Sequence, residues 1–373
     1  MSTPVKEPPM LTVNPRPGIL QIKPHMVATQ PTSDQDRKIN LSSNESALGP
    51  SPRAAEAAHA AMAHIERYSE DGPALLAAAI GAAFDLDPSR IVCGHGSDEL
   101  LQRLSRGFLN PGDEVIHSVH GYLKFPNYAY AMGATPVAAP DDHFRASVDG
   151  MVSCVTDRTR MVLLANPDNP TGTVLGGAEI RRLHARLPGN VLLVLDSAYA
   201  EYVTEPDYEL PVALVDAAQN VVMTRTFSKI FGMAGMRLGW LYGPPAIVDV
   251  LRRLGLTFPI SSPASAAGIA AMGDLAHRQR VFAHNRDQLA RFSAAVTALG
   301  LRHLPSNTNF LLLDFEGQKV SARQAYDFLD ARGVVGRMFA SPDYRNMLRI
   351  TIGLEDEMRA TVAALRECLG APA

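Results

Sequence analysis

The chain has 373 residues, of which 46% are hydrophobic and 20% are charged, and its formal net charge is −3. This composition is typical of a globular protein with a full-sized core, and the length predicts two domains. The charge provides no basic surface of the kind that binds nucleic acid or an anionic membrane, so neither partner is expected. The three cysteines are too few and too scattered for a disulfide framework or a zinc site, and they indicate a reducing compartment.

Neither the N-terminus nor any apolar stretch predicts export or membrane insertion. The opening segment MSTPVKEPPMLTVNPRPG carries prolines where a signal peptide needs an apolar core. The longest apolar stretch, Pro73–Phe84, is too short to span a bilayer. We therefore expect a cytoplasmic location.

In chain order, residues 1–49 are rich in Pro, Ser and Asn and are predicted to form an arm that joins a smaller domain. Residues 50–255 are expected to form the large domain. Within it, apolar runs alternate with helical patterns, which predicts a mostly parallel sheet, of the seven-stranded type, sandwiched by helices. The expected strands are Ile91–Cys93, Glu114–His117, Met161–Ala165, Val191–Leu195, Asn220–Thr224 and Leu238–Tyr242. The expected helices are Ser97–Phe108, Tyr122–Met132, Gly176–Leu187 and Glu209–Ala218.

The last third of the chain is predicted to form a smaller α/β domain over residues 256–373. The pattern is helical from Pro244 to about Leu299, which suggests a helix that links the two domains. Strands are then expected near Asn309–Asp314 and Met347–Ile352. Helices are expected at Ser321–Arg332 and Glu355–Leu369.

The segment TRTFSKIFGMAGMRLGW, residues 224–240, is the most informative in the chain. Its central residue Lys229 is one of only a few lysines in a chain that otherwise uses arginine. A desolvated lysine amine can lose its proton and act as a nucleophile, which arginine cannot do. Thr226, Ser228 and Arg237 around it are suited to a phosphate. A lysine that can form a Schiff base beside a phosphate site is what pyridoxal phosphate requires.

Three further motifs precede this segment. GHGSDE, residues 94–99, follows an expected strand and opens an expected helix. The free amides at that helix start, at Ser97 and Asp98, would bind a phosphate, although an ordinary capped helix has the same pattern. NPDNPTGT, residues 166–173, is a rigid turn after a strand, and its Asn169 could point its amide at a ring oxygen.

The third motif is DSAYAEY, which begins at the end of an apolar run. Asp196 would be costly to bury there without a cation, and a protonated pyridine nitrogen is such a partner. Tyr199, three residues later, could donate a hydrogen bond to a phenolic oxygen. Asp196 could instead cap the next helix, but the order of the three motifs with Ser-Lys favours the cofactor.

With these motifs the chain resembles the pyridoxal-phosphate aminotransferases of the aspartate aminotransferase fold, fold type I, from about Asn40 to the C-terminus. Among them it is most similar to the histidinol-phosphate aminotransferases. LSSNESALGPSP, GHGSDELL, NPDNPTGT, DSAYAEY, TFSKIFGMAGMRLGW and MLRITIG carry the resemblance.

The resemblance implies a role for each site residue. Lys229 would carry the cofactor, Asp196 would meet its ring nitrogen, and Asn169 and Tyr199 its phenolic oxygen. Tyr122 would stack on the ring. The residues expected at the phosphate are Ser97, Asp98, Thr226, Ser228 and Arg237.

The resemblance also implies a homodimer, in which Tyr68 reaches the phosphate of the neighbouring subunit. Arg337 and Arg349 would bind the anionic end of the substrate, with Asn44 lining that end. His25 stands where the family has a tyrosine at the substrate phosphate. Two other departures are His95 in the phosphate loop and His120-Gly121 before Tyr122.

The resemblance implies amino transfer between a primary amine, expected to be L-histidinol phosphate, and a 2-oxo acid, expected to be 2-oxoglutarate. An aromatic or other amino-acid aminotransferase would share every cofactor residue. A decarboxylase of a phosphorylated amino acid has the same fold. The fold also serves as a sensing module in transcription regulators, but the residues ahead of it here provide no DNA-binding domain. No metal site is expected.

Overall fold

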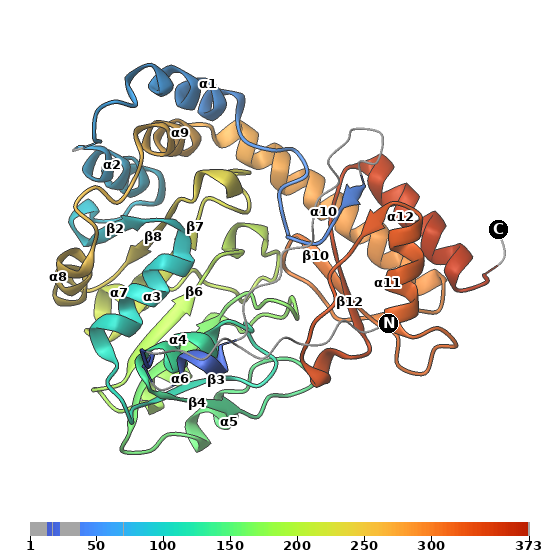
Figure 1. The fold of residues 1–373 in the computed structure, drawn as a ribbon, viewed down its shortest axis with the longest axis horizontal. Helices are drawn as coiled ribbons and strands as arrows, with labels where there is room; N and C mark the ends of the chain where they lie inside the picture. Colours follow the sequence, from blue (N-terminus) through green and yellow to red (C-terminus); the bar gives the residue numbers. More distant parts are fainter. Residues whose placement is uncertain (1–12, 17, 23–37, 70, 372–373) are drawn as a thin grey trace.

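The computed structural model describes residues 13–16, 18–22, 38–69 and 71–371. It contains a large mixed sheet and a smaller antiparallel sheet, which lie in different parts of the molecule (Figure 1), and a third sheet of two short parallel strands. The strands of the large sheet are β2 (Ile91–Gly94), β3 (Glu114–Ser118), β4 (Thr135–Ala139), β5 (Thr159–Ala165), β6 (Leu192–Asp196), β7 (Val221–Thr226) and β8 (Gly239–Tyr242). The smaller sheet contains β9 (Arg302–His303), β10 (Phe310–Asp314) and β12 (Met347–Thr351).

The large sheet has seven strands in the order β2-β8-β7-β6-β5-β3-β4. Only β8 runs antiparallel to its neighbours, β7 and β2. This arrangement confirms the fold class expected from the sequence. β4 was not predicted, because TPVAA is the half-exposed edge strand and lacks the continuous apolar run of the inner strands.

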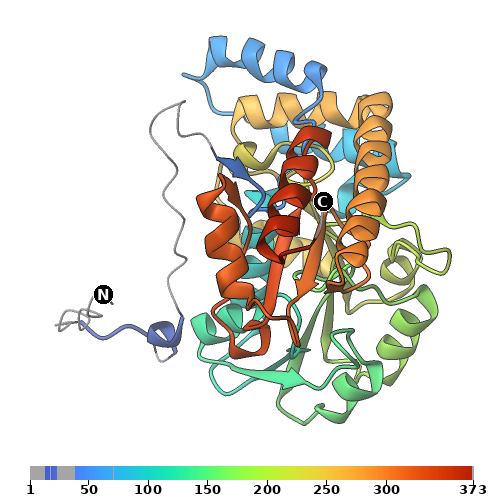
Figure 2. The same ribbon diagram turned by 90° about the vertical axis from the view of Figure 1, so that its right-hand side faces the viewer.

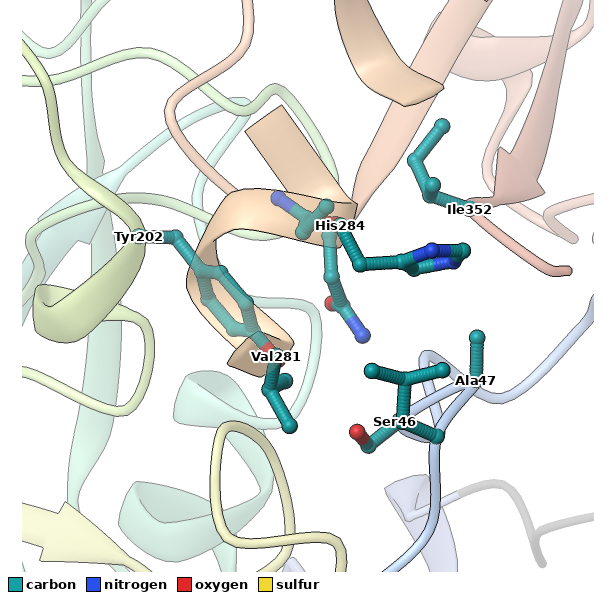
Figure 3. Close-up of a pocket in the computed structure, with 9 residues that line it drawn as sticks. Ser46, Ala47, Tyr202, Val281, His284 and Ile352 are labelled. Atoms are coloured by element: carbon teal, nitrogen blue, oxygen red, sulfur yellow. The ribbon is translucent and has the colours of Figure 1, made fainter. Parts of the chain in front are cut away.

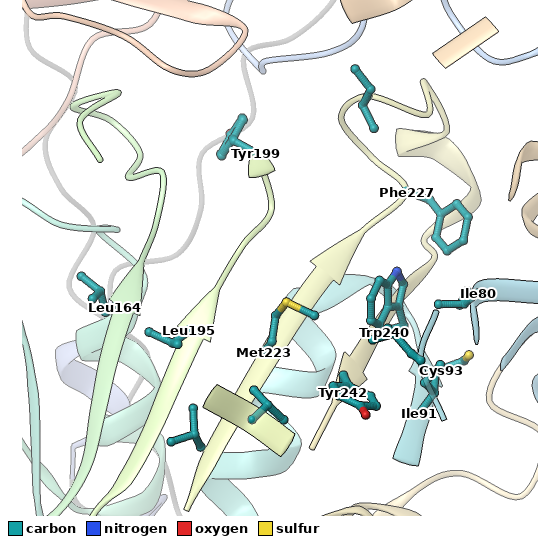
Figure 4. Packing of buried hydrophobic residues seen from close by; sticks show 14 of the residues in the cluster. Ile80, Ile91, Cys93, Leu164, Leu195, Tyr199, Met223, Phe227, Trp240 and Tyr242 are labelled. Carbon is teal, nitrogen blue, oxygen red and sulfur yellow. The ribbon is translucent and has the colours of Figure 1, made fainter. Parts of the chain in front are cut away.

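Helices cover both faces of the large sheet because alternate strand residues face opposite cores. Ile116, Leu195 and Met223 belong to one core, part of which is drawn in Figure 4. Val115, Val194 and Val222 belong to the core on the opposite face. The first face is covered by α2 (Gly72–Phe84), α5 (Val148–Ser153), α6 (Gly177–Arg186), α7 (Val212–Ala217) and α9 (Ser262–Gly273). The second is covered by α3 (Gly96–Phe108), α4 (Phe125–Met132) and α8 (Pro245–Leu254).

Two helix starts differ from the sequence prediction by more than one residue. α4 begins at Phe125 rather than Tyr122, with Pro126 in its first turn, where the missing N–H leaves no bond unmade. Tyr122 therefore lies in the turn before the helix. α7 begins at Val212, directly after Pro211. α1 (Pro52–Ala61) and the helical state of α2 had not been assigned from the sequence.

The smaller part has its own apolar core, formed around β10, β12, α11 (Ala322–Ala331) and α12 (Glu355–Cys368). The long helix α10 (Leu275–Ala298) runs from α9 towards this part, as Figure 1 shows. β1 (Ile39–Asn40) pairs in parallel with β11 (Val334–Val335), so residues 39–40 lie against the smaller part (Figure 2). The domain limits at residues 49 and 255 stay predictions. In the described ranges, no helix combines the length and hydropathy needed to cross a membrane.

Candidate active site

Most of the predicted cofactor residues lie at the carboxyl ends of the central strands of the large sheet. Asp196 is the last residue of β6 and Thr226 the last of β7. The NPDNPTGT loop follows β5, and the turn with Tyr122 follows β3. Because these four strands are parallel neighbours, their carboxyl ends bring the motifs together. In open α/β sheets, ligands bind at the carboxyl ends of the parallel strands.

Lys229 contacts both the sheet domain and the segment after β1. Its Nζ donates to the backbone oxygens of Ser43 at 3.2 Å and Asn44 at 3.1 Å, and lies 5.5 Å from the centre of the Tyr199 ring. Burial lowers the pKa of Lys229 to about 7, with the Arg349 and Arg237 charges acting in the same direction. Near neutral pH a large fraction of this amine is therefore uncharged and able to act as a nucleophile or base.

Asp196 is a buried carboxylate at the end of β6. It is 6% exposed, and the Thr224 hydroxyl donates to it at 3.0 Å. Burial raises the pKa of Asp196 to about 6, and the nearby charge of Asp98 adds to the effect. The sequence analysis missed Thr224. Its position could have indicated its role, because Thr224 lies two residues before Thr226 in β7 and alternate residues of a strand share a face.

A candidate anion site lies where the start of α3 meets the end of the Lys229 segment. α3 begins at Gly96 and has no side-chain cap, so its first-turn amides are not capped by its own N-cap residue. Arg237 Nη1 lies 3.3 Å from Ser228 Oγ. A Cβ on Gly96 would lie 2.8 Å from Arg237 Nη2, and one on Gly239 would lie 2.5 Å from Ser97 N. Because these two residues lack a Cβ, the start of α3, strand β8 and the Arg237 side chain can approach one another closely.

Asp98 takes part in this site only through its backbone. Its carboxylate accepts hydrogen bonds from the Tyr128 hydroxyl and, at 3.3 Å, from Lys124 Nζ. Both partners belong to the α4 region rather than to the helix start. The negative charge is therefore held by protein donors, and the amide of Asp98 can still face an anion.

Asn44 and Tyr199 form a direct pair, although the sequence analysis had placed Asn44 only at the substrate end. Asn44 Nδ2 donates to the Tyr199 hydroxyl at 2.9 Å. The amide N–H of Asn44 donates to Thr351 Oγ1 at 3.0 Å, and Thr351 Oγ1 donates to Asn44 Oδ1 at 3.1 Å. Asn44 is 1% exposed and has a positive φ of 57°, a conformation that asparagine tolerates better than most residues.

Arg349 connects the smaller part to the NPDNPTGT loop. Its Nη1 donates to Asn169 Oδ1, and its Nη2 donates to the backbone oxygen of Ser42 at 2.7 Å. The Nε atom is buried and has no partner among the described residues. Burial lowers the pKa of Arg349 to about 10. Arg337 pairs with Arg349 through backbone hydrogen bonds of 2.8 and 3.0 Å, so two guanidinium groups start from adjacent backbone positions.

Of the three remaining predicted residues, Tyr122 belongs to this group, since burial and the added charges of Asp98 and Asp196 raise its pKa, whereas Tyr68 lies apart and His25 cannot be placed. Tyr122 is half-buried, and its ring packs edge-on against Phe125 with centres 5.3 Å apart. Tyr68 is 74% exposed and stacks on Phe258 at 4.0 Å, outside the site of its own chain. His25 lies outside the described residues.

A small cavity lies behind the Asn44 segment and is distinct from the predicted site. Figure 3 shows Ser46, Ala47 and Ile352 around it, with Val281 and His284 of α10 on another side. None of the residues predicted to bind cofactor or substrate lines it.

The side chains present fit pyridoxal phosphate. Arg237, Ser228 and the start of α3 form a donor set for a phosphate. Asp196 is a buried carboxylate whose only side-chain hydrogen-bond donor among the described residues is Thr224, and it suits a cationic ring nitrogen. Lys229 provides an amine of low pKa for an aldehyde. Across the described ranges, there is no group of three or more His, Cys, Asp or Glu that could hold a metal ion.

Comparison with known protein families assigns the class. The family model described as aminotransferase class I and II matches residues 36–365. The chain belongs to this family, and pyridoxal phosphate is its cofactor.

Within this family, the chain is similar over nearly its whole length to histidinol-phosphate aminotransferases. A histidinol-phosphate aminotransferase of Rhodospirillum centenum is 48% identical over 355 residues, which cover 95% of this chain and 98% of the relative. One of Paramagnetospirillum magneticum is 46% identical, covering 96% of this chain and 99% of the relative. The crystal structure of a histidinol-phosphate aminotransferase from Sinorhizobium meliloti in complex with pyridoxal-5'-phosphate has a TM-score of 0.85 at 29% identity. It covers 90% of this chain and 93% of that chain.

Proposed function

We propose that this aminotransferase transfers the amino group of L-histidinol phosphate to 2-oxoglutarate. The observation that carries the proposal is the pairing of Arg337 with Arg349 next to the Lys229 site. A phosphate dianion can use two cations, whereas one bidentate arginine is enough for a carboxylate. The name shared by the relatives at 46–48% identity supports the choice of amine.

Lys229 is the general base and acid in this proposal. When bound, pyridoxal phosphate withdraws electrons from the substrate carbon next to the nitrogen and makes its proton acidic. The amine of Lys229 would remove that proton as a general base and return it as a general acid. A pKa of about 7 suits both directions of this transfer near neutral pH.

Asp196, Tyr199 and Asn169 hold the cofactor ring. Asp196 supplies the negative charge that keeps the ring nitrogen protonated. Because Asn44 donates to the Tyr199 hydroxyl, the hydroxyl proton of Tyr199 is left for the ring oxygen. Asn169 accepts from Arg349 through its oxygen, so its NH₂ group is left to donate to the same ring oxygen. Tyr122 covers the ring face.

The cofactor phosphate is held at the start of α3. The first-turn amides, including those of Ser97 and Asp98, would donate to this phosphate, and the positive end of the helix dipole would add to its stabilisation. Ser228 and Arg237 add a hydroxyl and a guanidinium group. Thr226 accepts from the Ser228 amide at 3.1 Å and so orders this segment.

Arg337→Ala should separate the two substrates. We expect its KM for L-histidinol phosphate to rise about 10- to 100-fold, because one charge-assisted contact costs roughly 1.5–3 kcal/mol. The KM for 2-oxoglutarate should change much less, since Arg349 remains to bind a carboxylate. Steady-state kinetics with each substrate varied in turn provide the measurement.

Arg345→Ala is the matched control, because Arg345 is an exposed arginine of the same segment. It should leave both KM values near those of the wild type. Equal activity of Arg337→Ala with all substrates would exclude phosphate recognition and favour an amino-acid aminotransferase.

The surface near Tyr68 supports a homodimer. Large apolar side chains are exposed on two segments, with Met62, Ile65 and Leu75 at 52–60% and Leu256 at 66%. An apolar groove next to them is lined by α1, by α9 and by residues 232–236, which directly follow the Lys229 turn. Apolar surface of this kind marks protein–protein contacts, and its position would bring the Tyr68 of one subunit near the partner's cofactor phosphate.

Mixed dimers test whether Tyr68 acts on the neighbouring site. Lys229→Ala and Tyr68→Ala homodimers should each be impaired, the first completely. A hybrid of the two contains one site with both Lys229 and Tyr68 intact, so co-refolded or co-expressed mixtures should regain activity beyond the sum of the parents. No recovery in a mixture that sedimentation identifies as dimeric would place Tyr68 in its own subunit's site.

A further inference from the structure

A histidine–carboxylate pair lies two residues before Tyr122, on the turn that follows β3. His120 Nδ1 is 2.8 Å from Asp141 Oδ2, and the Ser118 hydroxyl donates to the same oxygen at 3.3 Å. The Asp141 side chain is 5% exposed and that of His120 is 21% exposed. A carboxylate buried to this degree requires a cation or several donors, and a protonated imidazole supplies the cation.

The same histidine touches the smaller part of the molecule. The Tyr344 hydroxyl donates to the backbone oxygen of His120, and the two rings meet edge-on at 5.7 Å. Tyr344 is fully buried and belongs to the short helix η7 (Pro342–Tyr344). The Phe144 ring packs against His120 with centres 4.2 Å apart and lies 5.9 Å from the Tyr344 ring, so the three rings form one cluster. Phe144 has a positive φ of 68°, which is strained for an aromatic residue, and its ring contacts with His120 and Tyr344 hold this conformation.

Tyr344 is connected to Arg349 through the ring of Phe339. The Phe339 ring lies 5.2 Å from Tyr344, and the Arg349 guanidinium lies 5.6 Å from the Phe339 ring centre. In the other direction, the turn is closed by the Gly121 amide bonding to Ser118 O at 3.0 Å. His120 thus belongs to the turn that carries Tyr122 and contacts the segment that carries Arg337 and Arg349.

We propose that protonated His120, held by Asp141, is a positioning residue that keeps the Arg337–Arg349 segment docked on the Tyr122 turn, so that its deprotonation weakens binding of anionic substrates. The proposal rests on the proposed function, in which Arg349 binds the carboxylate of 2-oxoglutarate.

The charges around His120 set the direction of the pH effect. Asp141 faces it from the end of β4, Asp168 from the loop after β5, and Asp343 from η7 of the smaller part. The hydrogen bond to Asp141 raises the pKa of His120, the charges of all three carboxylates act in the same direction, and partial burial opposes them. For a group with a raised pKa, the stabilisation is complete below its ordinary pKa of 6.5 and is lost as the pH rises through the raised value. Docking should therefore weaken as the pH rises above 6.5.

The test is the KM for 2-oxoglutarate from pH 6 to pH 9, because both carboxylates of this substrate are ionised throughout that range. In the wild type we expect KM to rise about three- to tenfold across the range, whereas kcat follows Lys229. His120→Gln keeps a neutral donor but cannot be charged, so its KM should be high and should not vary with pH. Asp141→Asn should flatten the profile in the same way. His143→Gln is the matched control, because the His143 side chain is 99% exposed on the neighbouring turn, and it should keep the wild-type profile.

Tyr344→Phe provides a second, independent readout. It removes the hydroxyl that donates to the His120 backbone oxygen. We expect it to raise KM less than additively with His120→Gln, because this hydrogen bond and the edge-on packing of the two side chains join the same pair of segments. Additive effects, or a wild-type KM profile in His120→Gln, would overturn the proposal. So would a loss in His120→Gln that falls on kcat alone. If the proposed function itself fails, the wild type will not aminate 2-oxoglutarate with L-histidinol phosphate at any pH, which is a different result.

Discussion

Lys229→Ala will abolish transamination and the pH-dependent absorbance of the bound cofactor. Its amine is the group whose pKa burial lowers to about 7, and alanine has no nitrogen to bind the cofactor covalently or to move the proton. Loss of general acid–base catalysis alone costs about 10²- to 10⁴-fold, and loss of covalent attachment adds to this. Steady-state assay with L-histidinol phosphate and 2-oxoglutarate measures the loss.

Borohydride reduction followed by peptide mapping locates the attachment directly. The cofactor should be found on Lys229 in the wild type and on no lysine in the variant. Lys319→Ala, at an exposed lysine, should retain wild-type activity. A label on Lys124 or Lys319 would be incompatible with the proposed mechanism.

Asp196→Asn should bind some cofactor but lose most of kcat, on the order of a hundredfold or more. The change keeps the size of the side chain and an oxygen for the Thr224 hydroxyl, but it removes the charge that favours a protonated ring nitrogen. The contact it replaces is a charge-assisted hydrogen bond in a desolvated site. The measurement is kcat at saturating substrates, together with the cofactor content of the purified protein.

Asp98→Asn makes the same substitution at a second carboxylate of the site. Because Tyr128 and Lys124 hold the Asp98 side chain away from the α3 start, its kcat should stay within a few-fold of the wild type. Near-normal kcat in Asp196→Asn would mean that this carboxylate only serves the fold.

The strands that were predicted well are those with continuous apolar runs. β6 is buried along its whole length because helices cover both faces, so its sequence LLVLD identifies it as a strand. β4 and the two-residue strands β1, β9 and β11 carry no such pattern, since their residues are half-exposed or too few. The start of α4 shows that helical periodicity does not define where a helix begins, because Pro126 favours a start three residues after Tyr122.

The cofactor residues could be predicted because their motifs are local and end on parallel strands. Contacts between distant segments could not. Asn44 and Tyr199 are 155 residues apart in the sequence, and Arg349 and Asn169 are 180 apart. Asp98 shows a second limit: the sequence identifies a helix-start residue but not the direction of its carboxylate. His120 and Asp141 were missed as a pair, because a histidine and an aspartate on different turns carry no spacing signal.

The half-reaction tests the central claim most directly. Purified enzyme with bound pyridoxal phosphate is mixed with L-histidinol phosphate in the absence of any 2-oxo acid, and the pyridoxal absorbance is followed. We predict that this absorbance is lost to the pyridoxamine form, that 2-oxoglutarate restores it, and that kcat/KM for L-histidinol phosphate exceeds that for aromatic amino acids. Retention of the pyridoxal absorbance with L-histidinol phosphate, a higher kcat/KM for an aromatic amino acid, or release of carbon dioxide from a phosphorylated amino acid without an acceptor would contradict the account.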